Sequence, residues 1–154
     1  SSGKISGQWN SASSLGSGVW HQKVSGSSAI SRREKLGKTS ALNMQELIQA
    51  GPMLVENGRL IPGLEAMKSS ARTLILWDGG TRWWIGCSST CTLKELGKTL
   101  VTADHTGWPI KQGMNLDGGR SSDLWISDSV PGGPILRRPI WNKPVRNFLI
   151  LIPR

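Results

Sequence analysis

The chain has 154 residues, of which 37% are hydrophobic and 19% charged, a composition that suits one domain with a hydrophobic core. No uncharged apolar run approaches the roughly 18 to 20 residues of a membrane-spanning helix, so the sequence excludes a transmembrane helix. Nineteen Gly and eight Pro favour turns and short strands over an all-helical fold, because both residues disfavour helix interiors.

The net charge of +9 attracts polyanions, phosphate esters and acidic surfaces, but it names no single partner. The eight Trp side chains could stack on sugars or bases, although packing in the core is the more common use of this residue. The basic residues are dispersed, and none of the common nucleic-acid-binding patterns is present. Nucleic-acid binding is therefore a third-ranked interpretation, and we expect no nucleic-acid partner.

Residues 1–40 are dominated by Ser, Gly and scattered basic residues, a composition typical of a mobile tail or long loop. Within them, Gly18–Val24 predicts one short strand. No signal peptide is visible at the start of the chain. We divide the chain into an N-terminal segment, 1–40, which could be the remnant of a longer domain, and a main domain, 41–154.

Two helices are predicted. Apolar residues recur at helical spacing over Ser40–Ala50, and Gly51-Pro52 would end that helix. The second begins at Thr92, where Thr92 and Glu95 form a capping-box pattern, and extends to about Val101.

Two hairpins are predicted between these helices. Asn57-Gly58, the dipeptide that most readily adopts a two-residue hairpin turn, separates Met53–Glu56 from Arg59–Ile61. The second hairpin joins Ala71–Trp77 to Arg82–Cys87 through an Asp-Gly-Gly-Thr turn.

Three further strands are predicted at Met114–Leu116, Leu124–Ser127 and Val145–Ile152. Hairpins with two separated helices indicate an α+β fold, in which helices pack against a largely antiparallel or mixed sheet.

The polar stretch Met114–Ser122 lies between two apolar segments and is the richest candidate site. Glycines allow close backbone approach to a ligand, and Asn115, Asp117 and Ser121 add hydrogen-bonding groups. We expect Gly118 or Gly119 to have a positive φ. The local alternative is a tight turn whose Asp caps its own backbone.

The residues Asn115-Leu116-Asp117-Gly118-Gly119, followed by Ser121, resemble the Asn-Leu-Asp-Gly-Gly-Gly-Ser signature of the phosphodiester glycosidase family. Four other segments resemble that family in the same order. They are Gln49–Gly58, Ala71–Thr73, Leu93–Leu96 and Pro144–Asn147.

The resemblance has gaps. Arg120 stands where the family usually has a third Gly, and an early Asn-Gly-x-Phe segment is missing. These departures favour an alternative, a non-catalytic module that binds anionic or phosphorylated glycans.

The resemblance implies hydrolysis of a sugar-phosphate diester. The departing phosphate monoester is a stable anion, so cations that hold it can replace much of the proton donation on which other glycosidases depend. The resemblance also implies that Asp117, Arg72 and Asn115 are catalytic residues. Asp117 could act as a base, stabilise the transition state or orient sugar hydroxyls. The implied substrate-binding residues are Gly118, Gly119, Ser121 and Arg146, and we expect them to line one pocket with the catalytic three. His105, beside Asp104, is a second-tier candidate for acid–base work or substrate binding, and a loop histidine without a role is the more common case.

No cofactor is expected, although the Asp117 carboxylate could bind a divalent ion. His21 is a weaker acid–base candidate than His105. Trp108 and Trp125 could stack a sugar, but Trp125 suits the core better. Cys87 and Cys91 could be bridged in an exported protein or could be free. The resemblance implies a secreted, periplasmic or lumenal location.

Overall fold

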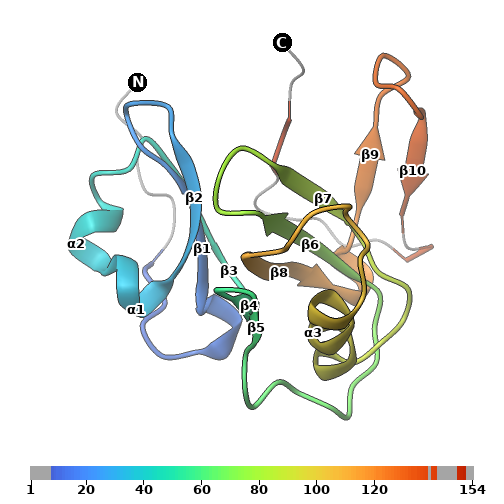
Figure 1. The fold of residues 1–154 in the computed structure, drawn as a ribbon, viewed down its shortest axis with the longest axis horizontal. Helices are drawn as coiled ribbons and strands as arrows, with labels where there is room; N and C mark the ends of the chain where they lie inside the picture. The colour runs from blue at the N-terminus through green and yellow to red at the C-terminus, as the bar shows by residue number, and fades with distance from the viewer. Residues whose placement is uncertain (1–7, 139, 142–148, 152–154) are drawn as a thin grey trace.

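The computed structural model describes residues 8–138, 140–141 and 149–151. It contains a five-stranded sheet in the order β5-β4-β8-β6-β7, a three-stranded sheet in the order β2-β1-β3 and the hairpin β9–β10 (Figure 1). Every strand pairing among the described residues is antiparallel. Together with the helices, these sheets confirm the α+β fold.

The strands are β1 (Gly18–Gln22), β2 (Ser28–Arg32), β3 (Glu46–Ala50), β4 (Met53–Glu56), β5 (Arg59–Leu60), β6 (Arg72–Trp77), β7 (Trp83–Cys87), β8 (Gln112–Gly118), β9 (Leu124–Ile126) and β10 (Ile135–Arg137). The helices are α1 (Arg33–Leu36), α2 (Lys38–Ala41) and α3 (Leu93–Thr102), with short 3₁₀ helices η1 (Ser14–Gly16) and η2 (Gly119–Ser121).

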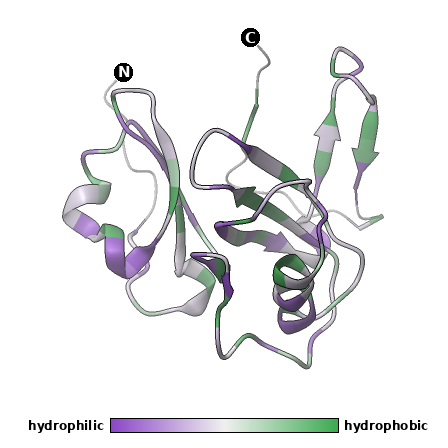
Figure 2. Ribbon diagram, viewed as in Figure 1, coloured by the Kyte–Doolittle hydropathy of each residue, from purple (hydrophilic) through white to green (hydrophobic). Residues whose placement is uncertain are grey.

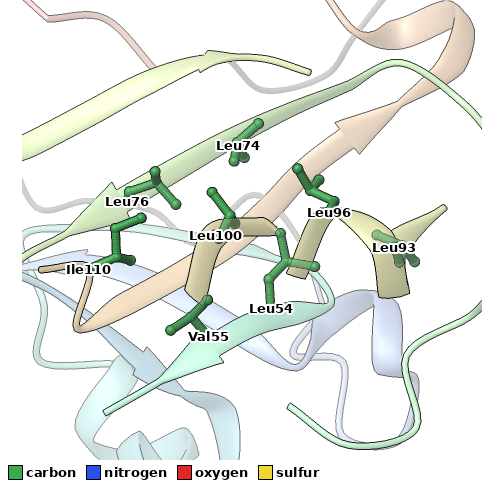
Figure 3. Packing of buried hydrophobic residues seen from close by; sticks show 8 residues of the cluster. All are labelled: Leu54, Val55, Leu74, Leu76, Leu93, Leu96, Leu100 and Ile110. Atoms are coloured by element: carbon green, nitrogen blue, oxygen red, sulfur yellow. The ribbon is translucent and has the colours of Figure 1, made fainter. Parts of the chain in front are cut away.

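One face of the five-stranded sheet packs against α3. Figure 2 shows that this helix is hydrophobic along one side and hydrophilic along the other, the pattern of a helix that lies on a core. Leucines from α3 meet apolar side chains of β4 and β6 (Figure 3). The buried cluster comprises Leu54, Val55, Leu74, Leu76, Leu93, Leu96, Leu100 and Ile110.

The other face of the same sheet packs against the three-stranded sheet. Ile75 and Met114 from the five-stranded sheet form a buried cluster with Met53 and with Ile30 of β2. Because successive side chains of a strand point to opposite faces, β6 sends Leu74 and Leu76 to one cluster and Ile75 to the other. The five-stranded sheet is therefore the middle of three layers.

Both predicted hairpins and the capped helix are confirmed. β4 and β5 flank Asn57-Gly58, whose φ angles are both positive, at 50° and 75°. β6 pairs with β7 along its length. The Thr92 side chain accepts a hydrogen bond from the backbone N–H of Glu95, and the Glu95 carboxylate accepts one from the backbone N–H of Thr92.

The predicted helix over Ser40–Ala50 is wrong. α2 ends at Ala41, and Glu46–Ala50 is β3, which pairs with β1 over all five residues. Leu42, the start of the apolar pattern, is 60% exposed. Intrinsic helix propensity is only a weak preference, and the apolar side of the predicted helix would have no core to pack against. The backbone hydrogen bonds to a neighbouring strand therefore decide the conformation of this segment.

The strand predicted in the N-terminal segment is present as β1, and β2 and α1 follow it before residue 40. The described part of this segment is therefore not the tail or long loop that its composition predicted. The strand predicted over Val145–Ile152 lies largely outside the described residues, and residues 149–151 are not in a strand. The predicted strand at Leu124–Ser127 is confirmed as β9, and its partner is β10.

Candidate functional site

A hollow of about 760 Å³ lies where β3, the start of β6 and the end of β8 meet. Four of the predicted site residues line it: Arg72, Asn115, Asp117 and Gly118. Its size is within the usual range for small-molecule sites. The remaining wall comes from Leu15, from residues 49–51 at the end of β3, from Leu116 and from residues 68–70, which precede β6.

Strand pairing brings these residues together although they are about 45 positions apart in the sequence. In the β6–β8 pair, Arg72 lies opposite Gly118 and Thr73 opposite Asp117. The register then shifts, so that Leu74 lies opposite Asn115. This bulge interrupts the regular alternation of side chains, and the three consecutive residues from Asn115 to Asp117 all border the hollow.

Asn115 is buried, with 3% of its surface exposed. Its side-chain amide Nδ2 donates to the carbonyl of Gly51 at 2.9 Å, and its backbone N–H donates to the carbonyl of Pro52 at 3.0 Å. Its Oδ1 atom has no hydrogen-bond partner among the described residues. A buried acceptor without a partner is uncommon, and here it belongs to a residue that borders the hollow.

The guanidinium of Arg72 lies against the backbone of Gly118. A Cβ atom at position 118 would come within 2.8 Å of Arg72 Nη1, so a side chain there would displace the cation. Arg72 Nη2 donates to the carbonyl of Lys68 at 3.4 Å, and its backbone N–H donates to Ser88 Oγ at 3.2 Å. Gly118 therefore makes room for a positive charge beside the signature strand.

The Asp117 carboxylate is half-buried, and its Oδ1 accepts a hydrogen bond from the N–H of Gly118 at 2.7 Å. Gly119 has a φ of 69°, which confirms the expected positive angle, whereas Gly118 is extended. Asp117 and Gly118 thus end β8 in extended form, and the turn begins at Gly119 in η2. The Asp117 carboxylate and the Arg72 guanidinium border the same hollow.

A family model described as phosphodiester glycosidase matches residues 2–152 of the 154. The protein belongs to the phosphodiester glycosidase family. Comparison with curated proteins gives no match. The family assignment confirms the resemblance carried by the signature, and it extends through the N-terminal segment that shows no family motif of its own.

The structure does not bring every predicted site residue of this phosphodiester glycosidase to the hollow. Gly119 and Ser121 follow the lining residues in η2 but are not part of the wall, and Ser121 Oγ donates to the carbonyl of Gly118 at 3.4 Å. His105 is exposed in the loop that enters β8 at Gln112, the end of the strand away from Asp117. Arg146 lies outside the described residues.

Other wall residues were not predicted as site residues. Gln49 lies in a segment that resembles the family, but its amide is used structurally, donating to the carbonyls of Asn10 and Gly16. Lys68, Ser69 and Ser70 carry no motif. Tertiary contacts, among them the pairing of Ser70 with Cys91 next to the β6–β7 hairpin, fix them at the hollow.

His21, Trp108 and Trp125, which were also considered from the sequence, do not line the hollow. His21 is buried in β1, with Nε2 3.0 Å from Ser31 Oγ, and burial followed by the charge of Lys23 lowers its pKa. Trp108 packs against the α3 core. Trp125 is 69% exposed on β9, so the expectation that it belongs to the core is wrong, because the β9–β10 hairpin stands apart from the layers (Figure 1).

Cys87 and Cys91 are free. Cys87 lies opposite Thr73, and Cys91 opposite Ser70, three residues earlier in the same segment. That offset corresponds to about 10 Å along an extended chain, beyond the roughly 7 Å that a disulfide can span between Cα atoms. Burial, and then the charge of Asp123, raises the pKa of the Cys87 thiol.

Within the described ranges, no three His, Cys, Asp or Glu side chains gather as a metal site requires. Binding of a divalent ion at Asp117 stays a prediction. The same part of the chain includes no helix with the length and apolar character needed to cross a membrane.

Proposed function

We propose that the protein hydrolyses a sugar-phosphate diester and releases the sugar from the phosphate. The observation that carries this proposal is the meeting of Arg72, Asn115 and Asp117 at one hollow in a member of the phosphodiester glycosidase family. The three side chains supply a cation, an open hydrogen-bond acceptor and a carboxylate.

The roles follow from charge. Arg72 holds the phosphate, because a planar guanidinium pairs with phosphate oxygens in bidentate geometry. Asn115 Oδ1 accepts a hydrogen bond from a sugar hydroxyl, since it is buried at the wall and has no other partner among the described residues. Asp117 faces the sugar, where its negative charge stabilises the positive charge that develops at the anomeric carbon.

The proposed reaction is hydrolysis of the bond between the sugar and the phosphate. The bond between the anomeric carbon and the phosphate oxygen breaks, and its electron pair stays on that oxygen. Water supplies the hydroxyl to the anomeric carbon and releases one proton. The products are a free sugar and a phosphate monoester.

The test compares a sugar-1-phosphodiester with an aryl glycoside of the same sugar. Arg72→Ala is expected to lower turnover of the diester far more than that of the aryl glycoside, because only the diester presents a phosphate. Asp117→Asn is expected to lower both by about a hundredfold or more. Arg82→Ala is the matched control, since Arg82 is exposed at the other end of the β6–β7 hairpin.

Equal losses on both substrates from Arg72→Ala would contradict its role in holding phosphate and make Arg72 a structural residue. Folded protein that turns over neither substrate would contradict hydrolysis.

The second candidate is a binding module that holds anionic or phosphorylated glycans without cleaving them. Arg120, in place of the family's third Gly, favours it: its side chain is exposed and its Nε donates to the carbonyl of Trp141 at 3.2 Å. Binding of sugar phosphates without turnover would support this function. A secreted, periplasmic or lumenal location stays a prediction.

A further inference from the structure

One part of the wall of the hollow, residues 68–70, is a short loop segment held by several hydrogen bonds. The carboxylate of Glu65 accepts from the backbone N–H of Lys68 at 2.8 Å, and the carbonyl of Glu65 accepts from the N–H of Lys94 on α3 at 3.0 Å. The carbonyl of Lys68 accepts from Arg72 Nη2. The backbone of Lys68 is therefore tied to its own loop and directly to the predicted phosphate-holding side chain.

This segment adds a second cation to the hollow. Among the lining residues, the charged ones are Lys68, Arg72 and Asp117, so positive charge is in excess. Lys68 is exposed, and it forms no ion pair with any carboxylate of the described residues. Its ammonium is thus available to a ligand on the same wall as the Arg72 guanidinium.

Resting on the proposed function, we propose that Lys68 pairs with the second negative charge that the phosphate gains during cleavage. A phosphodiester carries one negative charge. When the sugar–oxygen bond breaks and the electron pair remains on the oxygen, the departing monoester carries two, until it takes up a proton near its second pKa of about 6. Arg72 matches the charge present in the substrate, and Lys68 matches the charge that appears on the way to the product.

The two cations differ in the phosphate charge that each one binds. Loss of Lys68 is expected to leave binding of the singly charged diester nearly unchanged while slowing its cleavage, since an interaction that exists only as charge develops affects kcat more than KM. A charge-assisted hydrogen bond of ordinary strength corresponds to about a 10-fold effect or more.

The experiment uses the full chain and two probes without a sugar, phenyl phosphate and methyl phenyl phosphate. For the wild type, binding of phenyl phosphate is expected to tighten as the pH rises from 5 to 7.5 and the second charge appears, whereas binding of the diester probe stays level. Lys68→Gln is expected to weaken binding of phenyl phosphate about 10-fold at pH 7.5 and to flatten its pH dependence, and Lys68→Arg is expected to restore both. Lys98→Gln, which removes the same charge from the exposed side of α3, is the matched control.

The outcomes separate this proposal from the proposed function. If the wild type cleaves diesters but Lys68→Gln behaves like Lys98→Gln in kcat and in the pH dependence of phenyl phosphate binding, the role of Lys68 is overturned and hydrolysis stands. If no diester is cleaved but Lys68 still determines binding of the doubly charged phosphate, hydrolysis is overturned and the recognition by Lys68 is supported.

Discussion

The two larger sheets differ in how completely they are buried. β6 in the five-stranded sheet has four consecutive buried residues, Thr73–Leu76, because α3 covers one face and the three-stranded sheet covers the other. In the three-stranded sheet, the central strand β1 has three buried residues, Gly18, Val19 and His21, and the edge strand β3 has none. The difference indicates that the five-stranded sheet provides most of the stability of the fold, since buried apolar area is the main favourable contribution to folding.

The candidate site lies at the contact between these unequal sheets. Arg72, Asn115 and Asp117 come from the well-buried sheet, whereas Gly51 follows the last residue of β3. The hydrogen bond from Asn115 to the carbonyl of Gly51 joins the two sides. A rigid sheet thus holds the chemistry, and a more exposed sheet completes the wall.

The largest expected effect tests the difference in burial directly. Leu76→Ala, at a side chain that is 1% exposed, is expected to lower the free energy of unfolding by about 2–5 kcal/mol, because it leaves a cavity between β6 and α3. Leu47→Ala, in the half-buried part of β3, is expected to cost less than half as much. Urea unfolding of both variants measures the contrast, and equal losses would show that the sheets contribute alike.

The next effect tests the junction between the sheets. A Cβ atom at Gly51 would come within 2.7 Å of the carbonyl oxygen of Ser14, which is backbone and cannot rotate away. Gly51→Ala is therefore expected to cost about 1–3 kcal/mol and to reduce activity, because the carbonyl that Asn115 contacts must move.

Gly80→Ala is the matched control for that variant, since its Cβ would lie 3.4 Å from Asp78 Oδ1, an ordinary contact in an exposed turn. Thermal unfolding and turnover of the two variants measure the effect. A stable and fully active Gly51→Ala protein would mean that the junction adapts.

A smaller effect is expected from the cap of α3, the layer that covers the five-stranded sheet. Thr92→Ala removes the side-chain acceptor for the N–H of Glu95 and is expected to cost about 1 kcal/mol. Thr99→Ala, on the exposed side of the same helix, is expected to be neutral or slightly stabilising, because Ala is the better helix former. If both variants lose the same stability in urea, the capping box is unimportant to α3.

The smallest effect concerns the pH dependence of the three-stranded sheet. Burial and Lys23 lower the pKa of His21 below its ordinary value of 6.5. The unfolded chain therefore binds a proton near pH 6.5, where the folded chain does not. The contribution of neutral His21 to stability is complete above pH 6.5 and declines as the pH falls below it.

Melting temperatures between pH 7.5 and 5.5 test this contribution. The wild type is expected to lose stability with falling pH more steeply than His21→Gln, which has no group that titrates in this range. Parallel slopes would place the pH dependence on another residue.

The sequence by itself determined the features that depend on interactions between residues close together in the chain. Asn57-Gly58 specifies a turn because its backbone tolerates positive φ, and Thr92 with Glu95 specifies a helix start because the two residues satisfy each other's amides. The signature around Asp117 identifies the family from adjacent residues alone. Each of these features depends on residues within a few positions of one another.

The tertiary structure decided what depends on distant partners. Glu46–Ala50 became a strand because β1 lies beside it, and Lys68 reached the hollow because Ser70 pairs with Cys91. The same pairings separate Cys87 from Cys91 and place Arg72 against Gly118. Strand partners and register arise from the burial of whole faces across the sheets, so no local pattern in the sequence encodes them.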